Sequence, residues 1–198
     1  MKLKTLILAL GLIAGLITSL TTLANDEIDY TWLEINYTNI ESDAFGSLNS
    51  TSLGGSFAIN DDFYLAADFS QKNKGINSFT ENSYRFSLGF NKAIADKTDF
   101  YAELGYRRYD LNNNGGMLAT IGTRTVLSDK FELITALDYQ DFNVSGVGDF
   151  SNRLNAADEG FSLGVTALYK FNKNSSLHFG IKEEASNVSP TIGYRYSW

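Results

Sequence analysis

The chain has no cysteine, one proline and one histidine among its 198 residues. Without cysteine it cannot be a disulfide scaffold, and thiol catalysis and cysteine-based metal sites are excluded. A single histidine argues against a histidine-based metal site, so we expect neither a metal nor a cofactor. Runs with helical periodicity are also missing after residue 24. What remains is a chain built from β-structure.

Basic residues are the scarcer charged group. The sequence has 16 Lys and Arg against 23 Asp and Glu, a formal net charge of −7. A nucleic-acid partner would favour a basic face, so we expect no nucleic-acid binding. Glycine, phenylalanine and tyrosine are plentiful, at 17, 14 and 11 residues. This composition is typical of β-sheet proteins.

The N-terminus has the pattern of a secretory signal peptide. Lys2 and Lys4 precede an apolar run at residues 6–17, and polar residues then lead to the small Ala24. The run falls short of the roughly 20 residues that an uncleaved membrane helix, the alternative interpretation, would need. We therefore predict that residues 1–24 are cleaved and that one domain covers 25–198. Cleavage would remove two lysines and change the net charge from −7 to −9.

The rest of the sequence alternates apolar and polar residues with period two, which predicts β-strands. The pattern recurs ten times, at residues 33–37, 53–60, 63–70, 84–91, 100–107, 119–124, 131–140, 161–171, 177–182 and 191–198. No linker or change of composition divides these segments, so we expect a single domain.

The connections between the segments fall into two classes. Four are tight and polar, at residues 60–62, 94–98, 128–130 and 172–175. The others are mostly longer and rich in Asn, Ser, Gly and Asp, at residues 41–49, 71–82, 110–115 and 143–160, with a short last link at 185–189. Short and long connections alternate, so they would gather at opposite ends of a barrel, as in bacterial outer-membrane barrels.

Alternation alone is also compatible with a soluble β-sandwich. The even number of segments, the segregated connections and the length of each segment favour an antiparallel up-and-down transmembrane barrel of about ten strands. Aromatic residues often open and close the apolar face, as Phe63 and Phe69 or Phe131 and Tyr139 do, which predicts aromatic girdles. An eight-stranded barrel is the alternative if the first or ninth segment is not a strand.

The last segment carries a recognisable motif. Thr191, Gly193, Tyr196 and Trp198 form the spacing Thr-x-Gly-x-x-Tyr-x-Trp at the last residue of the sequence. This motif resembles the C-terminal β-signal of bacterial outer-membrane proteins, which the barrel assembly machinery reads. Together with the hairpin pattern, the chain resembles the small OmpX-like and OmpA-transmembrane-like barrels. The resemblance implies an outer-membrane location and contact with lipid and lipopolysaccharide, but no particular activity.

Charged residues of both signs occupy the polar face of the predicted strands and would point into the lumen. They are Glu34, Asp68, Arg85, Glu103, Arg107, Arg124, Glu132, Asp138, Lys170, Lys182 and Arg195. The interior of a ten-stranded barrel is narrow, and a buried charge without a partner is costly. We expect a network of ion pairs that fills the lumen. The alternative is a narrow charged water path.

His178 is the one residue suited to acid–base catalysis in a lipid-modifying enzyme. Glu183, Glu184 and Ser186 follow it in sequence, but Glu183 has the opposite parity and would face lipid or the strand end. His178 also lies near a tight turn, away from the long connections. We therefore expect a lumen-lining, non-catalytic histidine and no enzymatic activity.

The long connections are the expected contacts with the environment. Phe79 and Phe150 could contact an extracellular partner, and Asp149, Asp158 and Glu159 could bridge divalent cations to lipopolysaccharide. We predict a monomeric, non-enzymatic integral outer-membrane protein whose loops meet the environment. The alternatives are a narrow diffusion channel for small solutes and a lipid-modifying enzyme that uses His178.

Overall fold

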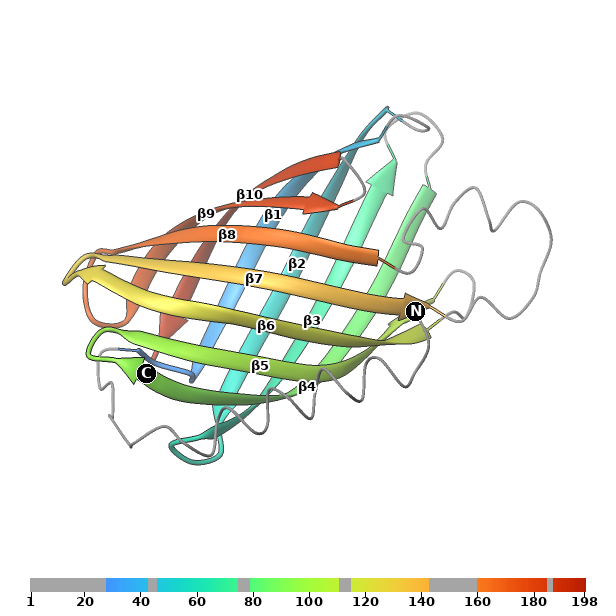
Figure 1. Ribbon diagram of the computed structural model, residues 1–198. Helices are drawn as coiled ribbons and strands as arrows, with labels where there is room; N and C mark the ends of the chain where they lie inside the picture. The colour runs from blue at the N-terminus through green and yellow to red at the C-terminus, as the bar shows by residue number, and fades with distance from the viewer. Residues whose placement is uncertain (1–27, 43–45, 75–78, 111–114, 143–159, 185–186) are drawn as a thin grey trace.

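Ten β-strands form a closed antiparallel barrel (Figure 1). The computed structural model describes residues 28–42, 46–74, 79–110, 115–142, 160–184 and 187–198. The strands are β1 (Trp32–Ser42), β2 (Gly46–Ala58), β3 (Phe63–Lys74), β4 (Phe79–Ala95), β5 (Thr98–Tyr109), β6 (Gly115–Ser128), β7 (Phe131–Phe142), β8 (Gly160–Lys170), β9 (Ser175–Glu184) and β10 (Asn187–Ser197). Each strand pairs with its neighbours in sequence, and β10 pairs with β1.

The predicted ten-stranded up-and-down barrel is therefore confirmed, against both the eight-stranded barrel and the open sandwich. The predicted signal peptide, residues 1–24, lies outside the described residues. Nowhere in the described part of the chain is there a helix with the length and apolar character needed to span a membrane.

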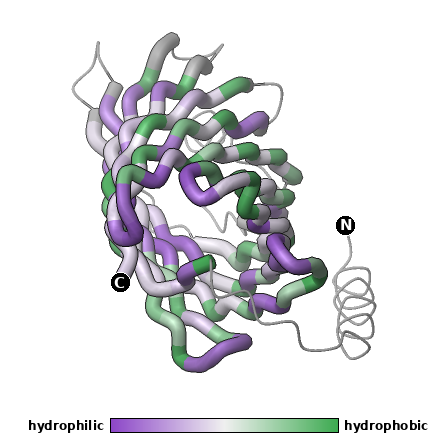
Figure 2. Tube along the Cα trace, turned by 90° about the vertical axis from the view of Figure 1, so that its left-hand side faces the viewer, coloured by the Kyte–Doolittle hydropathy of each residue, from purple (hydrophilic) through white to green (hydrophobic). Residues whose placement is uncertain are grey.

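The barrel exposes apolar side chains and encloses polar ones. Phe57, Phe86 and Phe179 are 62%, 66% and 53% exposed, whereas the inward-facing Arg124 and Glu132 are 5% and 2% exposed. Hydrophobic and hydrophilic residues alternate along the strands in the end-on view (Figure 2). This is the reverse of a soluble protein, and it follows from the period-two side-chain direction of a β-strand.

Aromatic pairs mark both ends of the outer face. Phe63 packs on Phe90 where β3 begins after a tight turn, with ring centroids 5.4 Å apart. Phe69 and Tyr84 form a second pair on the same strands towards the other end, at 5.2 Å. β7 and β8 repeat the arrangement with Phe131–Tyr169 and Tyr139–Phe161, each at 5.1 Å. These pairs lie where the sequence predicts aromatic girdles.

Two of the four tight turns, at residues 60–62 and 172–175, share one pattern of hydrogen bonds. Asn60 Oδ1 accepts hydrogen bonds from the backbone N–H groups of Asp62 and Phe63, at 3.0 and 2.9 Å. Asn172 Oδ1 accepts from Asn174 and Ser175 in the same way, both at 2.9 Å. An asparagine side chain that bonds its own backbone two and three residues on stabilises a turn locally. The end of the barrel that carries these turns is called the turn end.

The predicted connection at 110–115 agrees with the structure to within one residue, because β5 ends at Tyr109 and β6 begins at Gly115. The prediction of long connections was wrong at two other places. The strands continue through most of residues 41–49 and 71–82, which leaves only residues 43–45 and 75–78 between them. Polar side chains extend the ladder there: Ser70 and Ser83 hydroxyls lie 2.8 Å apart, and Gln71 Nε2 donates to Asn82 Oδ1 at 3.0 Å. Because the hydrogen bonds of a β-ladder are made by the backbone, a strand can extend beyond the residues that alternate between apolar and polar. β10 likewise begins at Asn187, inside the predicted last link.

The barrel closes where β10 meets β1. The register runs from Trp32 opposite Ser197 to Thr38 opposite Thr191, whose hydroxyl oxygens lie 2.8 Å apart. Pro190 lies one residue beyond this ladder and pairs only with β9. Because proline has no N–H to donate, it is tolerated in a strand only at such a position.

Candidate functional site

The lumen is the site where charged residues gather. The eleven charged residues that sequence parity assigns to the inner face all line cavities inside the barrel. Their exposed apolar neighbours along each strand point the other way. They come from every strand except β2, and from segments that lie far apart in the sequence.

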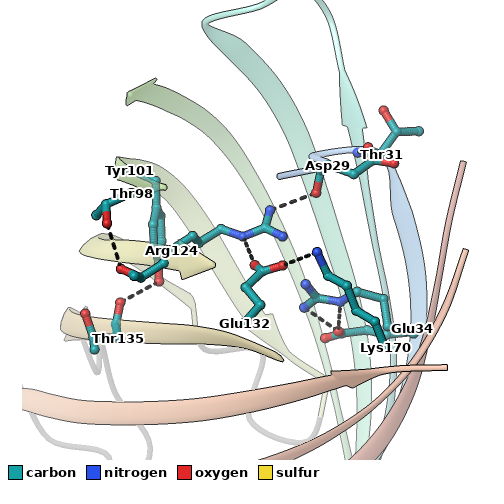
Figure 3. A network of polar contacts seen from close by, with 11 residues as sticks. Asp29, Thr31, Glu34, Thr98, Tyr101, Arg124, Glu132, Thr135 and Lys170 are labelled. Carbon is teal, nitrogen blue, oxygen red and sulfur yellow. Dashed lines mark hydrogen bonds and ion pairs between the residues drawn. The ribbon is translucent and has the colours of Figure 1, made fainter. Parts of the chain in front are cut away.

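Arg124 organises the network at the turn end (Figure 3). Its Nε donates to Glu132 Oε1 at 2.6 Å, and its Nη1 donates to the Asp29 carbonyl at 2.8 Å. Lys170 Nζ lies 3.3 Å from the other carboxylate oxygen of Glu132. Glu132 thus meets two cations while it is only 2% exposed. A carboxylate this deeply buried requires such partners.

Two further ion pairs lie farther from the turns. Arg85 Nη2 bonds to Glu103 Oε2, and Tyr64 donates to the other Glu103 oxygen at 3.0 Å. Lys182 Nζ lies 2.9 Å from Asp138 Oδ2 on a different wall of the barrel. Thr120 Oγ1 donates to Asp138 Oδ1 at 2.6 Å. Each carboxylate therefore has a cation and a hydroxyl as partners.

A fourth cluster crosses the closure between β1 and β10. Arg195 Nε and Nη2 both donate to Glu34 Oε2, at 2.9 and 2.7 Å, and Asn36 Nδ2 donates to Glu34 Oε1 at 3.0 Å. The Arg195 guanidinium also lies over the Trp32 ring, 4.2 Å from its centroid. A planar guanidinium can bond a carboxylate and stack on an aromatic ring at once.

Asp68 and Arg107 lie nearer the mouth opposite the turns. Both line the same cavity, and Asp68 is directly across the ladder from Arg85. Arg107 Nη1 contacts Gln140 Oε1 at 3.4 Å, and its buried Nε has no hydrogen-bond partner among the described residues. The pairing of Arg107 is thus looser than that of Arg124.

The lumen contains two neighbouring cavities, each with charged residues in its lining. One of about 340 Å³ lies towards the turn end and is lined by Tyr30, Tyr64, Tyr101 and Arg124 among others. One of about 330 Å³ lies towards the opposite mouth and is lined by Asp68, Lys72 and Arg107 among others. The residues that line both are Trp32, Glu34, Asn36, Arg85, Glu103, Lys182 and Thr191. The lumen is therefore not completely filled by its ion pairs.

Residues 28–31, which precede β1, fold into the lumen at the turn end. Ile28 and Tyr30 are each only 7% exposed and pack with Tyr64, Tyr101 and Val126. The Tyr30 and Tyr64 ring centroids are 4.9 Å apart, and the Arg124 guanidinium lies 4.6 Å from the Tyr30 centroid. Burial raises the pKa of the Tyr30 phenol well above its ordinary value, so it stays neutral.

The sequence analysis missed this segment because residues 28–31 lie outside the alternating segments and carry no motif. Parity does place Tyr64 and Tyr101 on the inner face with Asp68 and Glu103. Asp99 was missed as well, although it has the parity of Glu103; it is 3% exposed and pairs in register with Arg124.

His178 lies inside the barrel near the turn end and is 4% exposed. Its Nδ1 is 3.7 Å from Glu34 Oε2, too far for a hydrogen bond. His178 and Asn36 lie so close to Gly193 that a Cβ atom there would overlap both side chains. Within the described residues, no group of three His, Cys, Asp or Glu side chains could hold a metal ion. The histidine is packed as a lumen residue.

The residues of the predicted β-signal divide between the two faces of β10. Tyr196 and Trp198 are 46% and 60% exposed on the outer face, and their rings stack with centroids 6.0 Å apart. Thr191 lines both cavities of the lumen. The residues predicted to make loop contacts are not tested by the structure. Phe150, Asp149, Asp158 and Glu159 lie outside the described residues, and the side chain of Phe79 is not described.

Comparison with known proteins identifies the fold. No family model and no curated protein matches the chain. The NanC porin matches with a TM-score of 0.56 and 9% identity, over 84% of this chain and 100% of that one. An outer-membrane channel from Pseudomonas putida F1 matches with a TM-score of 0.51 and 9% identity, over 86% and 96%. The KdgM porin in complex with disordered oligogalacturonate matches with a TM-score of 0.48 and 15% identity, over 83% of this chain and 99% of that one.

At these identities the likeness covers the fold alone. The NanC porin and the channel from Pseudomonas putida F1 share the barrel architecture of this chain. The resemblance to the OmpX-like and OmpA-transmembrane-like barrels stays a prediction.

Proposed function

We propose that the chain is an integral barrel of a bacterial outer membrane and that its lumen is a narrow diffusion channel for small polar solutes. The membrane location is supported by the apolar outer face, where side chains such as Phe86 and Trp198 are 66% and 60% exposed. A closed sheet satisfies its own backbone hydrogen bonds, so it can lie in lipid. The signal peptide and the β-signal predicted from the sequence agree with this location.

The observation that carries the channel is the pair of adjacent cavities in the lumen, of about 340 and 330 Å³, each lined in part by charged residues. A barrel serving only as a scaffold for loops would gain stability from a filled interior, because cavities cost packing energy. Arg107 lines the mouth-side cavity and supplies a positive charge there. Two solved barrels of the same fold are named a porin and an outer-membrane channel, which agrees with this proposal.

The proposed role is non-enzymatic. His178 is buried among lumen residues at the turn end and is not hydrogen-bonded to Glu34, which argues against an activated catalytic base. Contacts of the loops with lipopolysaccharide or an extracellular partner, a monomeric state and handling by the barrel assembly machinery remain part of the proposal.

Conductance in planar lipid bilayers tests the channel. The purified, folded protein should give small unitary current steps in a salt gradient. Arg107→Glu should shift the reversal potential towards cation selectivity, whereas the outward-facing Leu104→Ala should leave it unchanged. In Ile28→Ala/Tyr30→Ala the two side chains that pack inside the turn end are truncated. The absence of steps both in the native protein and in this double variant would overturn the channel function.

A further inference from the structure

We propose that residues 28–31 form a movable plug that closes the turn end of the lumen. The inference rests on the proposed channel function for its consequence, since a plug matters where solutes pass. The position of the segment is the first argument. It precedes β1 at the end of the barrel where β10 finishes, yet it turns inward, and Ile28 and Tyr30 are each 7% exposed.

The plug packs against inward-facing side chains of several strands at that level. Tyr30 packs against Tyr64 from β3, with centroids 4.9 Å apart, and lies in one cluster with Tyr101 from β5 and Val126 from β6. The Arg124 guanidinium lies 4.6 Å from the Tyr30 ring centroid, and Arg124 donates to the Asp29 carbonyl. Side chains from three strands thus meet on one segment. The cavity of about 340 Å³ lies directly behind it and has Tyr30 in its lining.

The plug is held differently from the strands around it. It lies outside the ladder. Among the described residues, the hydrogen bonds that tie it to the barrel include Arg124 Nη1 to the Asp29 carbonyl at 2.8 Å, Ala58 N–H to Thr31 Oγ1 at 3.1 Å and Trp198 N–H to the Thr31 carbonyl at 3.3 Å. The buried Tyr30 hydroxyl has no hydrogen-bond partner among the described residues. A segment with few backbone bonds and an unsatisfied buried group opens more readily than a paired strand.

Arg124 would keep its strongest partner when the plug leaves. The bond from its Nε to Glu132 at 2.6 Å does not involve residues 28–31, and Lys170 supports the same carboxylate at 3.3 Å. Removal of Tyr30 and the Asp29 carbonyl therefore leaves Arg124 paired with Glu132. The barrel can lose the plug and keep both this ion pair and the backbone ladder between β6 and β7.

Cysteine labelling tests the plug without relying on conductance, because the native chain has no cysteine. Val126, buried at 3% beneath the plug, is replaced by cysteine, and the folded protein in detergent is treated with a water-soluble maleimide. Labelling of Val126→Cys should be slow in the native background and at least about tenfold faster in Ile28→Ala/Tyr30→Ala, because the plug loses its two buried side chains. Asn174→Cys, on an exposed turn, is the control and should label rapidly in both.

Current recordings on the same two backgrounds give the second readout. The unitary conductance or open probability should rise in Ile28→Ala/Tyr30→Ala relative to the native protein. Equal labelling of Val126→Cys in the two backgrounds, with both proteins migrating as folded barrels on unboiled gels, would overturn the plug. Faster labelling without current steps in either protein would leave the plug standing and overturn the proposed channel instead.

Discussion

Arg195 and Glu34 join the last and the first strand of the barrel across 161 residues of sequence. Two nitrogens of the guanidinium donate to one carboxylate oxygen, at 2.9 and 2.7 Å, and the arginine stacks on Trp32 beside it. The two side chains are only 9% and 13% exposed. The pair therefore lies across the closure of the barrel, where it adds a buried ion pair to the backbone ladder between β1 and β10.

The closure pair should contribute strongly when one partner is removed. Arg195→Met leaves the Glu34 carboxylate buried without its main cation, so we expect the free energy of unfolding in detergent or lipid to fall by about 3–5 kcal/mol. Urea titration followed by gel mobility measures it. The double variant Glu34→Gln/Arg195→Met removes both charges and should recover part of the loss. A double variant as unstable as the single one would contradict this account.

The lipid-facing surface can be probed with a charge. Val165 is in the middle of β8 and 43% exposed on the outer face. In a membrane barrel Val165→Lys should destabilise by about 2–4 kcal/mol in vesicles, because a lysine near the midplane must be desolvated. Phe171→Lys, at the turn end, is the matched control and should cost about 0–1 kcal/mol. Equal, small effects at both positions would contradict burial of this face in lipid.

Gly193 has a packing role that is separate from any part in assembly. A Cβ atom at this position would overlap His178 and Asn36. Gly193→Ala should therefore lower stability by about 1–3 kcal/mol when the purified chain refolds in detergent without any assembly factor. His178→Ala/Gly193→Ala should refold better than Gly193→Ala alone, because the His178 imidazole that would overlap the new Cβ atom is removed. If the single variant refolds like the native protein, the glycine serves only recognition.

Substitution of Trp198 tests the predicted β-signal. Trp198→Ala should reduce the amount of folded barrel in the outer membrane of cells more than it reduces the stability of the purified protein. The control is Tyr194→Ala, which removes an outward-facing aromatic residue from the same strand but lies outside the motif. Quantification of heat-modifiable protein in membrane fractions measures the effect. Similar losses in the two variants would reduce Trp198 to an interfacial anchor.

Local alternation was enough to predict the barrel and the direction of its side chains. Glu34, Glu103 and Asp138 share strand parity with the small and polar residues around them, and each points inward as its parity requires. The turns were also readable, because Asn60 and Asn172 form their hydrogen bonds within three residues of sequence. The strand ends at the mouth opposite the turns could not be predicted from the sequence, because backbone pairing continues through polar residues such as Gln71 and Asn82.

Partners inside the lumen could not be read in the same way. Parity puts Arg195 and Glu34 on the inner face, but only the register of β10 against β1 makes them neighbours. The inward fold of residues 28–31 has no periodic signal at all, because it depends on space left between Tyr64, Tyr101 and Val126.

The sequence by itself determined that this chain is a barrel with an apolar outside and a charged inside, because side-chain direction in a strand follows from the two-residue period of the backbone. Only the tertiary structure decided which charges pair, how much of the lumen stays open and what closes its turn end. Those properties depend on closure, which brings together residues that no local pattern relates.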